Sequence, residues 1–157
     1  MSGTPGKLIG RYAKGFGLAT DNLRHCEALI ASRIALPSVM PGTFNIALDA
    51  SFFIKPDAAI SAIEYNGWEV VLLQRCTIGG RAAAITRPHT HEIEPKPGEL
   101  YFGHGLAYVE LMAPFEVAHT FGFAHGDQVE IELDGDEAWW TAALDRNWGR
   151  RRASGMR

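Results

Sequence analysis

Apolar and polar residues alternate over a short segment that follows a Pro-Gly pair, and the segment reads Thr43-Phe44-Asn45-Ile46-Ala47-Leu48. This period of two predicts a strand with one apolar face and one polar face, so that the side chains of Thr43 and Asn45 point the same way. A hydroxyl and a carboxamide suit a hard cation such as magnesium, which keeps waters or takes phosphate oxygens as its other ligands. The same pattern also fits an ordinary strand whose two polar side chains face solvent.

Other segments carry strand patterns too, and they cover residues 7–12, 58–65, 68–75, 81–86, 108–112 and 128–133. Asn66-Gly67 and Gly79-Gly80 follow two of these segments, and both pairs are typical of tight hairpin turns. Apolar residues at helical spacing predict a helix that ends at about residue 35, before Pro37, and a short helix is expected over residues 115–121. Successive hairpins with little helix between them favour an antiparallel barrel.

The length of 157 residues suits one domain with a substantial core. We expect that domain to cover residues 1–149, followed by a basic, flexible tail over residues 150–157. A net charge of -3 and a pI near 6.0 give no general electrostatic argument for binding nucleic acid.

Cys26 and Cys76 lie in apolar surroundings without metal-ligand spacing, which predicts reduced, packed thiols. No signal-peptide pattern opens the chain, and no apolar run approaches the roughly 18 residues of a membrane span. We therefore expect a soluble, cytoplasmic protein without a membrane partner.

Three other places along the chain are candidates for binding or catalysis. Glycines alternate at Gly15 and Gly17, and such a loop can turn its backbone N–H groups toward a phosphate. Glu110 is the only charged residue in an apolar strand, which either a hydrogen-bonded structural partner or a ligand would explain. His89 and His91 fall in an irregular segment, residues 87–105, where they are metal ligands, substrate contacts or solvated loop residues.

Considered together, these motifs resemble those of the CTP-dependent riboflavin kinase family, best known from archaea. The family's patterns are a G-x-G-x-G loop, a G-T-L-N strand, an E-I-I-A-P segment and a D-G-D-x-V turn. The matching residues follow the same order over most of the chain: Gly15 and Gly17, Gly42-Thr43-Phe44-Asn45, Glu110-Leu111-Met112-Ala113-Pro114, and His125-Gly126-Asp127-Gln128-Val129.

The resemblance implies a mostly β fold, namely a six-stranded cradle-loop barrel of the riboflavin-synthase type with two or three short helices. It also implies a magnesium-dependent transfer of the terminal phosphate of CTP to the 5′-hydroxyl of riboflavin, which gives FMN. Such a reaction needs mainly positioning and charge neutralisation from the protein. Riboflavin and CTP would then be the partners of the chain, with Mg²⁺ as its cofactor.

Roles for individual residues follow from the same resemblance. Thr43 and Asn45 would bind magnesium, and Glu110 would bind the flavin and orient or deprotonate its attacking hydroxyl. Thr90 would contact the flavin phosphate or ribityl chain. The nucleotide would lie between two segments, Gly15, Phe16, Gly17, Leu18, Ala19 and Thr20 on one side and Phe115, Glu116, Val117 and Ala118 on the other.

The chain departs from the family pattern at three places. Ala19 replaces the third loop glycine, the segment at residues 87–105 is longer than in the family, and Glu116 stands where a basic residue is frequent. A carboxylate there would repel a triphosphate unless it points away. Two alternatives therefore stay open: a flavin- or nucleotide-binding relative without turnover, and a different metal-dependent enzyme that uses His89, His91, His104 and Glu110.

Overall fold

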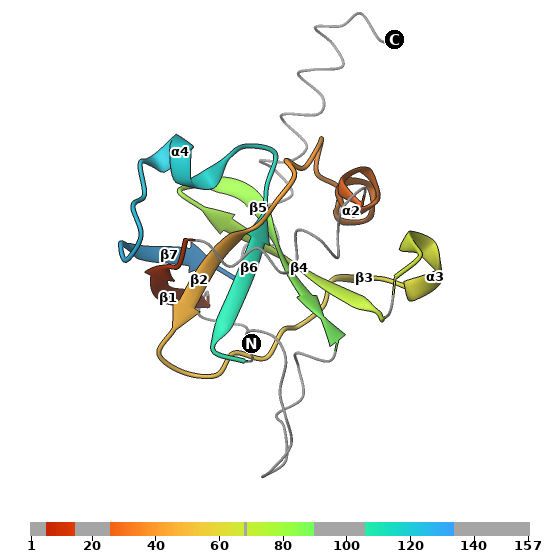
Figure 1. Ribbon diagram of the computed structural model, residues 1–157, viewed down its shortest axis with the longest axis horizontal. Helices are drawn as coiled ribbons and strands as arrows, with labels where there is room; N and C mark the ends of the chain where they lie inside the picture. The colour runs from red at the N-terminus through yellow and green to blue at the C-terminus, as the bar shows by residue number, and fades with distance from the viewer. Residues whose placement is uncertain (1–5, 15–25, 68, 90–105, 134–157) are drawn as a thin grey trace, which may run out of the picture.

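The computed structural model describes residues 6–14, 26–67, 69–89 and 106–133 (Figure 1). The strands are β1 Lys7–Tyr12, β2 Phe44–Leu48, β3 Ala58–Ile60, β4 Val71–Ile78, β5 Arg81–Pro88, β6 Tyr108–Met112 and β7 Gln128–Glu132. The helices within these ranges are α2 Glu27–Ile34, α3 Ala62–Tyr65 and α4 Val117–Phe121. The fold is thus mostly β, as the sequence predicts.

Six of these strands form a closed antiparallel barrel. The strand order is β3-β4-β5-β6-β2-β1-β7, and β7 pairs back with β4. This closing pairing is short, with Thr77 opposite Glu132 and Ile78 opposite Ile131. β3 lies outside the ring as a neighbour of β4. The predicted six-stranded barrel with a few short helices is confirmed.

Alternate side chains of the strands fill the inside of the barrel. They include Phe44 and Ile46 of β2, as the period of two predicts, together with Leu111 of the neighbouring β6 and Ile85 of β5. A second apolar cluster lies on the other face of β4 and β5, where α2 covers it with Ile30, Ala31 and Ile34. In Figure 1, α2 accordingly lies beside β3 and β4.

One predicted hairpin is wrong. Residues 58–65 are not a single strand, because β3 ends at Ile60 and α3 follows. Ser61 begins α3 in a capping box with Glu64, and Asn66 ends it with a left-handed backbone at φ 56°. A left-handed Asn ends a helix as readily as it forms a hairpin turn. The Ser-x-x-Glu spacing was the local signal for the helix.

Glu64 also joins α3 to α2 through an ion pair with Arg33, whose guanidinium donates to the Glu64 carboxylate. Hydrogen bonds from Arg33 and then from Ser61 lower the pKa of Glu64 to about 2. The carboxylate is therefore ionised through the physiological range.

Most other element boundaries follow the sequence closely, but β4 covers Val71–Ile78, about three residues later than the strand predicted over residues 68–75. Gly79-Gly80 is the predicted two-residue turn, with φ of 56° and 76° between β4 and β5. The first helix ends at Ile34, and α4 ends before Gly122 at φ 71°. β5 extends to Pro88, so residues 87 and 88, which the sequence assigns to the irregular segment, are strand residues.

Arg87, which the sequence places in a loop, is therefore a strand residue and is buried. Its guanidinium donates to the backbone carbonyls of Phe52 and Tyr108. The charged group lies 5.4 Å from the centroid of the Phe52 ring. Arg87 thus joins the segment after β2 to the start of β6.

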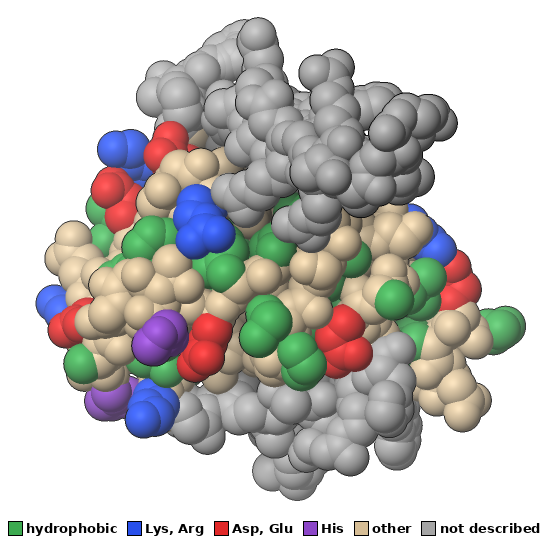
Figure 2. Space-filling model, turned by 90° about the horizontal axis from the view of Figure 1, so that it is seen from above, with side chains coloured by type: hydrophobic (Ala, Val, Ile, Leu, Met, Phe, Trp, Pro, Cys, Tyr) green, Lys and Arg blue, Asp and Glu red, His purple; other side chains and the backbone are tan. Residues whose placement is uncertain are grey.

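Both cysteines are buried free thiols, as predicted. Burial raises the pKa of Cys76, and also that of Cys26. No helix in the described ranges combines the length and the hydrophobicity that crossing a bilayer requires. On the face seen in Figure 2, acidic and basic side chains drawn in colour are interspersed, and no large area there carries one sign alone.

Gly10 lies in β1 at a point where the barrel leaves no room for a side chain. A Cβ built at Gly10 would lie 2.4 Å from the backbone oxygen of Ala47 and 2.5 Å from a methyl carbon of Ile46. Gly10→Ala is expected to lower the free energy of unfolding by about 1–3 kcal/mol, because β1 and β2 must move apart.

Urea unfolding followed by circular dichroism measures this change. Gly6→Ala is the matched control, since its Cβ would meet only the Leu133 side chain, at 3.4 Å or more. If Gly10→Ala and Gly6→Ala unfold at the same urea concentration, the expected loss of stability in Gly10→Ala is contradicted.

Candidate functional site

A row of polar side chains crosses three neighbouring strands of the barrel. Asn45 of β2 lies opposite Glu110 of β6, and Glu110 lies opposite Thr86 of β5. Directly opposed residues place their side chains on the same face of a sheet. The exposed fractions are only 4% for Asn45, 4% for Glu110 and 2% for Thr86. The alternative that Asn45 faces solvent is therefore wrong.

Thr43 precedes β2, and its hydroxyl joins this row. Oγ1 of Thr43 lies 3.0 Å from Oδ1 of Asn45 and 3.2 Å from Oε1 of Glu110. The hydroxyl has one proton for these two acceptors, so it donates fully to only one of them at a time. The structure thus brings together Thr43 and Asn45, as the alternation predicts, and adds an oxygen of Glu110.

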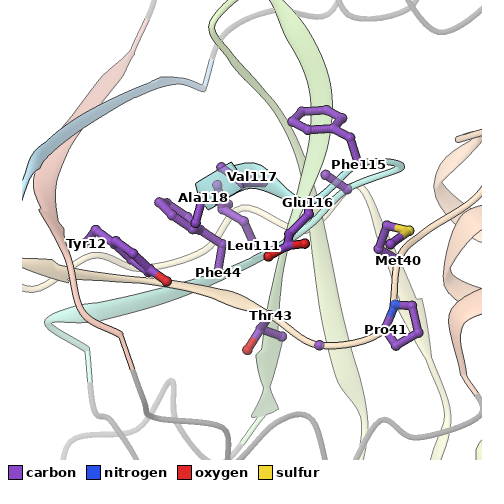
Figure 3. Close-up of a pocket in the computed structure, with 12 residues that line it drawn as sticks. Tyr12, Met40, Pro41, Thr43, Phe44, Leu111, Phe115, Glu116, Val117 and Ala118 are labelled. Carbon is purple, nitrogen blue, oxygen red and sulfur yellow. The ribbon is translucent and has the colours of Figure 1, made fainter. Parts of the chain in front are cut away.

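A pocket of about 210 Å³ opens beside Thr43 (Figure 3). Its walls come from Tyr12 of β1, from residues 40–44, from the end of β6 at Leu111 and Ala113, and from residues 115–118. The pocket therefore combines one of the two predicted metal ligands with one of the two segments predicted to hold a nucleotide.

Aromatic rings form two sides of this pocket. Tyr12 stacks on Phe44 with ring centroids 4.5 Å apart and planes 16° from parallel. Phe115 packs edge-on against Phe121, with centroids 5.9 Å apart and planes at 79°. The Arg81 guanidinium lies 3.9 Å from the centroid of the Phe115 ring. These contacts hold Phe44 and Phe115 in fixed orientations.

Tyr12, Met40 and Phe44 were not predicted as site residues. Tyr12 and Phe44 fall in strands, where an aromatic residue in the apolar half of the pattern looks like any core residue. Met40 is 44% exposed, and its position next to Pro41 gave no signal for a ligand. Only the tertiary arrangement shows that these side chains border a pocket.

Glu116 is the only charged residue that lines the pocket within the described ranges. Figure 3 shows its carboxylate in the space between Phe115 and Thr43. Glu116 occupies the N-cap position of α4, with an extended backbone, yet its side chain makes no capping hydrogen bond. The Glu116 side chain therefore does not point away from the pocket. A carboxylate in this orientation would repel a triphosphate placed there.

The end of β1 is fixed to the turn that precedes β7. The backbone N–H of Lys14 donates to Nδ1 of His125 over 3.0 Å, and the N–H of Tyr12 donates to the carbonyl of Asp127 over 2.9 Å. Asp127 also closes the predicted turn by accepting from the N–H of Ala124. These contacts fix the backbone of Lys14, the last described residue before the segment predicted to bind phosphate.

Several predicted site residues lie outside the described residues, and their roles stay predictions: Gly15, Phe16, Gly17, Leu18, Ala19, Thr20, Thr90, His91 and His104. His89 is described and exposed, and its N–H donates to the carbonyl of Val70. Across the described part of the chain, no three His, Cys, Asp or Glu side chains gather where they could hold a metal ion.

Neither comparison with known proteins assigns a family to this chain. No protein-family model matches it, and no curated protein matches it significantly.

Proposed function

We propose that this protein is a magnesium-dependent kinase that transfers the terminal phosphate of CTP to the 5′-hydroxyl of riboflavin, giving FMN. One observation carries the proposal. The Thr43 hydroxyl contacts both Asn45 and Glu110, and Thr43 lines the same pocket as residues 115–118. The proposed metal ligands, the proposed flavin carboxylate and a proposed nucleotide segment are thus neighbours, although they lie far apart in the sequence.

The oxygen atoms around Thr43 fit magnesium. Thr43 offers a hydroxyl, Asn45 a carboxamide oxygen and Glu110 a carboxylate oxygen, and hard cations prefer such ligands. In the proposed assignment Thr43 and Asn45 hold the ion. A bound Mg²⁺ neutralises charge on the phosphates of the nucleotide.

Glu110 is the residue that we propose to orient and deprotonate the attacking 5′-hydroxyl of riboflavin. Its carboxylate is buried and lies within hydrogen-bond reach of Thr43. A general base must lie near the proton that it removes. Glu110 would orient the 5′-hydroxyl and accept its proton as the new oxygen–phosphorus bond forms, while the bond to the leaving CDP breaks.

The direct test is to incubate the purified chain with riboflavin and Mg²⁺ and with CTP, UTP or ATP in turn, and to follow FMN by chromatography. We expect FMN with CTP, and we expect its formation to stop when a chelator removes the metal. The proposal fails if no nucleotide supports FMN formation under any of these conditions.

A second candidate is a binding protein that holds a flavin or nucleotide without turnover. The observation that favours it is the Glu116 carboxylate within the pocket, since a like charge opposes a triphosphate placed against it. Calorimetry with riboflavin, FMN and CDP distinguishes the two functions. Binding of these ligands by a protein that forms no FMN would support the second candidate.

A further inference from the structure

We infer that Ala47 of β2 and Tyr108 of β6 form the surface on which the planar ring of the acceptor substrate lies. This Ala47–Tyr108 surface is on the side of Glu110 that faces away from the pocket beside Thr43. The inference rests on the proposed kinase function, and it adds two residues to the acceptor side of the proposed site.

The register of β2 and β6 places this surface directly beside the row of polar side chains. Asn45 lies opposite Glu110, and Ala47 lies opposite Tyr108. Side chains two residues apart on a strand point to the same face of the sheet. Ala47 and Tyr108 therefore share a face with Asn45 and Glu110, about 7 Å further along the two strands. The two strands lie side by side in Figure 1.

The order of the residues along this face suits phosphoryl transfer. Thr43 borders the pocket, Asn45 follows two residues later, and Ala47 follows after two more. Neither Ala47 nor Tyr108 lines the pocket. In phosphoryl transfer the attacking and leaving oxygens lie roughly in line, on opposite sides of the phosphorus. A nucleotide at the pocket end therefore leaves the Ala47–Tyr108 end to the acceptor.

The opposite direction along β6 is filled by the protein itself. Met112 lies two residues beyond Glu110, is 2% exposed and belongs to the apolar cluster that α2 covers. Ala84, its partner on β5, is 0% exposed and belongs to the same cluster. Ala47 and Tyr108 are only half-buried. A substrate that reaches Glu110 can therefore extend past Tyr108 but not past Met112.

The two side chains suit a flat aromatic ring. Planar rings stack on tyrosine, and the small alanine opposite it keeps the surface low. The backbone on both sides is held in place, because Arg87 donates to the Tyr108 carbonyl and the Leu48 N–H donates to the Ala107 carbonyl over 2.8 Å. The ribityl chain of riboflavin spans a distance comparable to the separation of the two pairs. A ring at Tyr108 would thus bring the 5′-hydroxyl to the Glu110 carboxylate.

The test measures the dissociation constants of riboflavin and of lumiflavin, which has the ring system without the ribityl chain, by fluorescence titration. Tyr108→Leu is expected to weaken the binding of both ligands about fivefold or more, the lower part of the range for losing an aromatic stacking partner. Tyr108→Phe keeps the aromatic ring and should bind both ligands about as tightly as the wild-type chain.

Ala47→Leu is an independent variant, because a leucine would occupy the space beside Tyr108 without removing any side chain. It is expected to weaken both ligands as well. Ala59→Leu is its matched control, since it makes the same change at an exposed position of β3. Tyr65→Leu is the control for Tyr108→Leu, because Tyr65 is a half-buried tyrosine of α3. Both controls should keep the wild-type dissociation constants, and urea unfolding verifies that every variant is folded.

The outcomes separate this inference from the proposed kinase function. In the kinase assay, Tyr108→Leu should raise the KM of riboflavin and leave the KM of CTP unchanged. The inference is overturned if the wild-type chain binds neither ligand, or if folded Tyr108→Leu or Ala47→Leu binds both as tightly as the wild-type chain does. FMN formation together with either of these results supports the kinase and removes the Ala47–Tyr108 surface. Flavin binding that depends on both residues, in a protein that forms no FMN, supports the surface and removes the kinase.

Discussion

Thr43→Val is expected to reduce magnesium-dependent FMN formation by roughly 10²-fold or more, the scale of loss when one preorganised polar contact to a reacting group is removed. Valine has almost the shape of threonine, but it lacks the oxygen that meets Asn45 and Glu110 at 3.0 and 3.2 Å. The measurement is kcat/KM for FMN formation over a range of Mg²⁺ concentrations, with urea unfolding to verify that the barrel remains stable.

Thr77→Val provides the matched control for this substitution. Thr77 is also a buried threonine, 7% exposed, but it lies in β4 and does not line the pocket. Its replacement is expected to leave kcat/KM close to the wild-type value. Wild-type kcat/KM in Thr43→Val would rule out the proposed metal ligand.

Asn45 is a less specific probe of the same site. Removing its carboxamide is also expected to abolish turnover, but the side chain is only 4% exposed. Loss of a buried polar group leaves its hydrogen-bond partners unsatisfied, which costs stability as well as activity. Thr43, which borders the pocket, therefore tests the chemistry with less disturbance of the fold.

Ile46→Ala is expected to lower the free energy of unfolding by about 2–5 kcal/mol, the usual cost of truncating a fully buried isoleucine. Ile46 is 1% exposed and belongs to the cluster that fills the barrel. It lies opposite Tyr12 on one side and Val109 on the other, so the cavity would open between three strands.

Urea unfolding at constant temperature measures this loss. Ile9→Ala removes the same atoms from a side chain of β1 that is 51% exposed, and it should cost much less. If the two variants lose equal stability, Ile46 is not a core residue of the barrel in solution.

The period of two along the chain was sufficient to predict most of the barrel. β1 and β6 have the predicted bounds, and the apolar half of β2 points inward, because alternation records which face of a strand meets the core. The alternation of apolar and polar residues does not predict what covers the polar face of the strand. For that reason the burial of Asn45 and Glu110 could not be read from the pattern.

Local turn signals were less informative, because one dipeptide serves two structures. Gly79-Gly80 forms the predicted hairpin, whereas Asn66-Gly67 ends a helix. Both use backbone conformations with positive φ, and only the surrounding residues decide which element results.

The candidate site was predicted in part. Alternation placed Thr43 and Asn45 on one face, whereas the nucleotide role of residues 115–118 came from the family resemblance. The direction of Glu116 could not be predicted, because its backbone is extended at the start of α4 and the turn from β6 decides where the side chain points. Pocket residues such as Tyr12 carry no local signal that separates them from the core.

The pairing of β1 with β7 also bears on how the protein folds during synthesis. The first described strand finds its partner in the last one, Leu8 opposite Ile131 for example. A ribosome-bound chain that has not yet released β7 cannot complete the ring, however much of β4, β5 and β6 has emerged. Contacts between such distant parts of a chain form slowly. We therefore expect the nascent chain to expose its barrel interior, and to depend on chaperones, until β7 has left the ribosome.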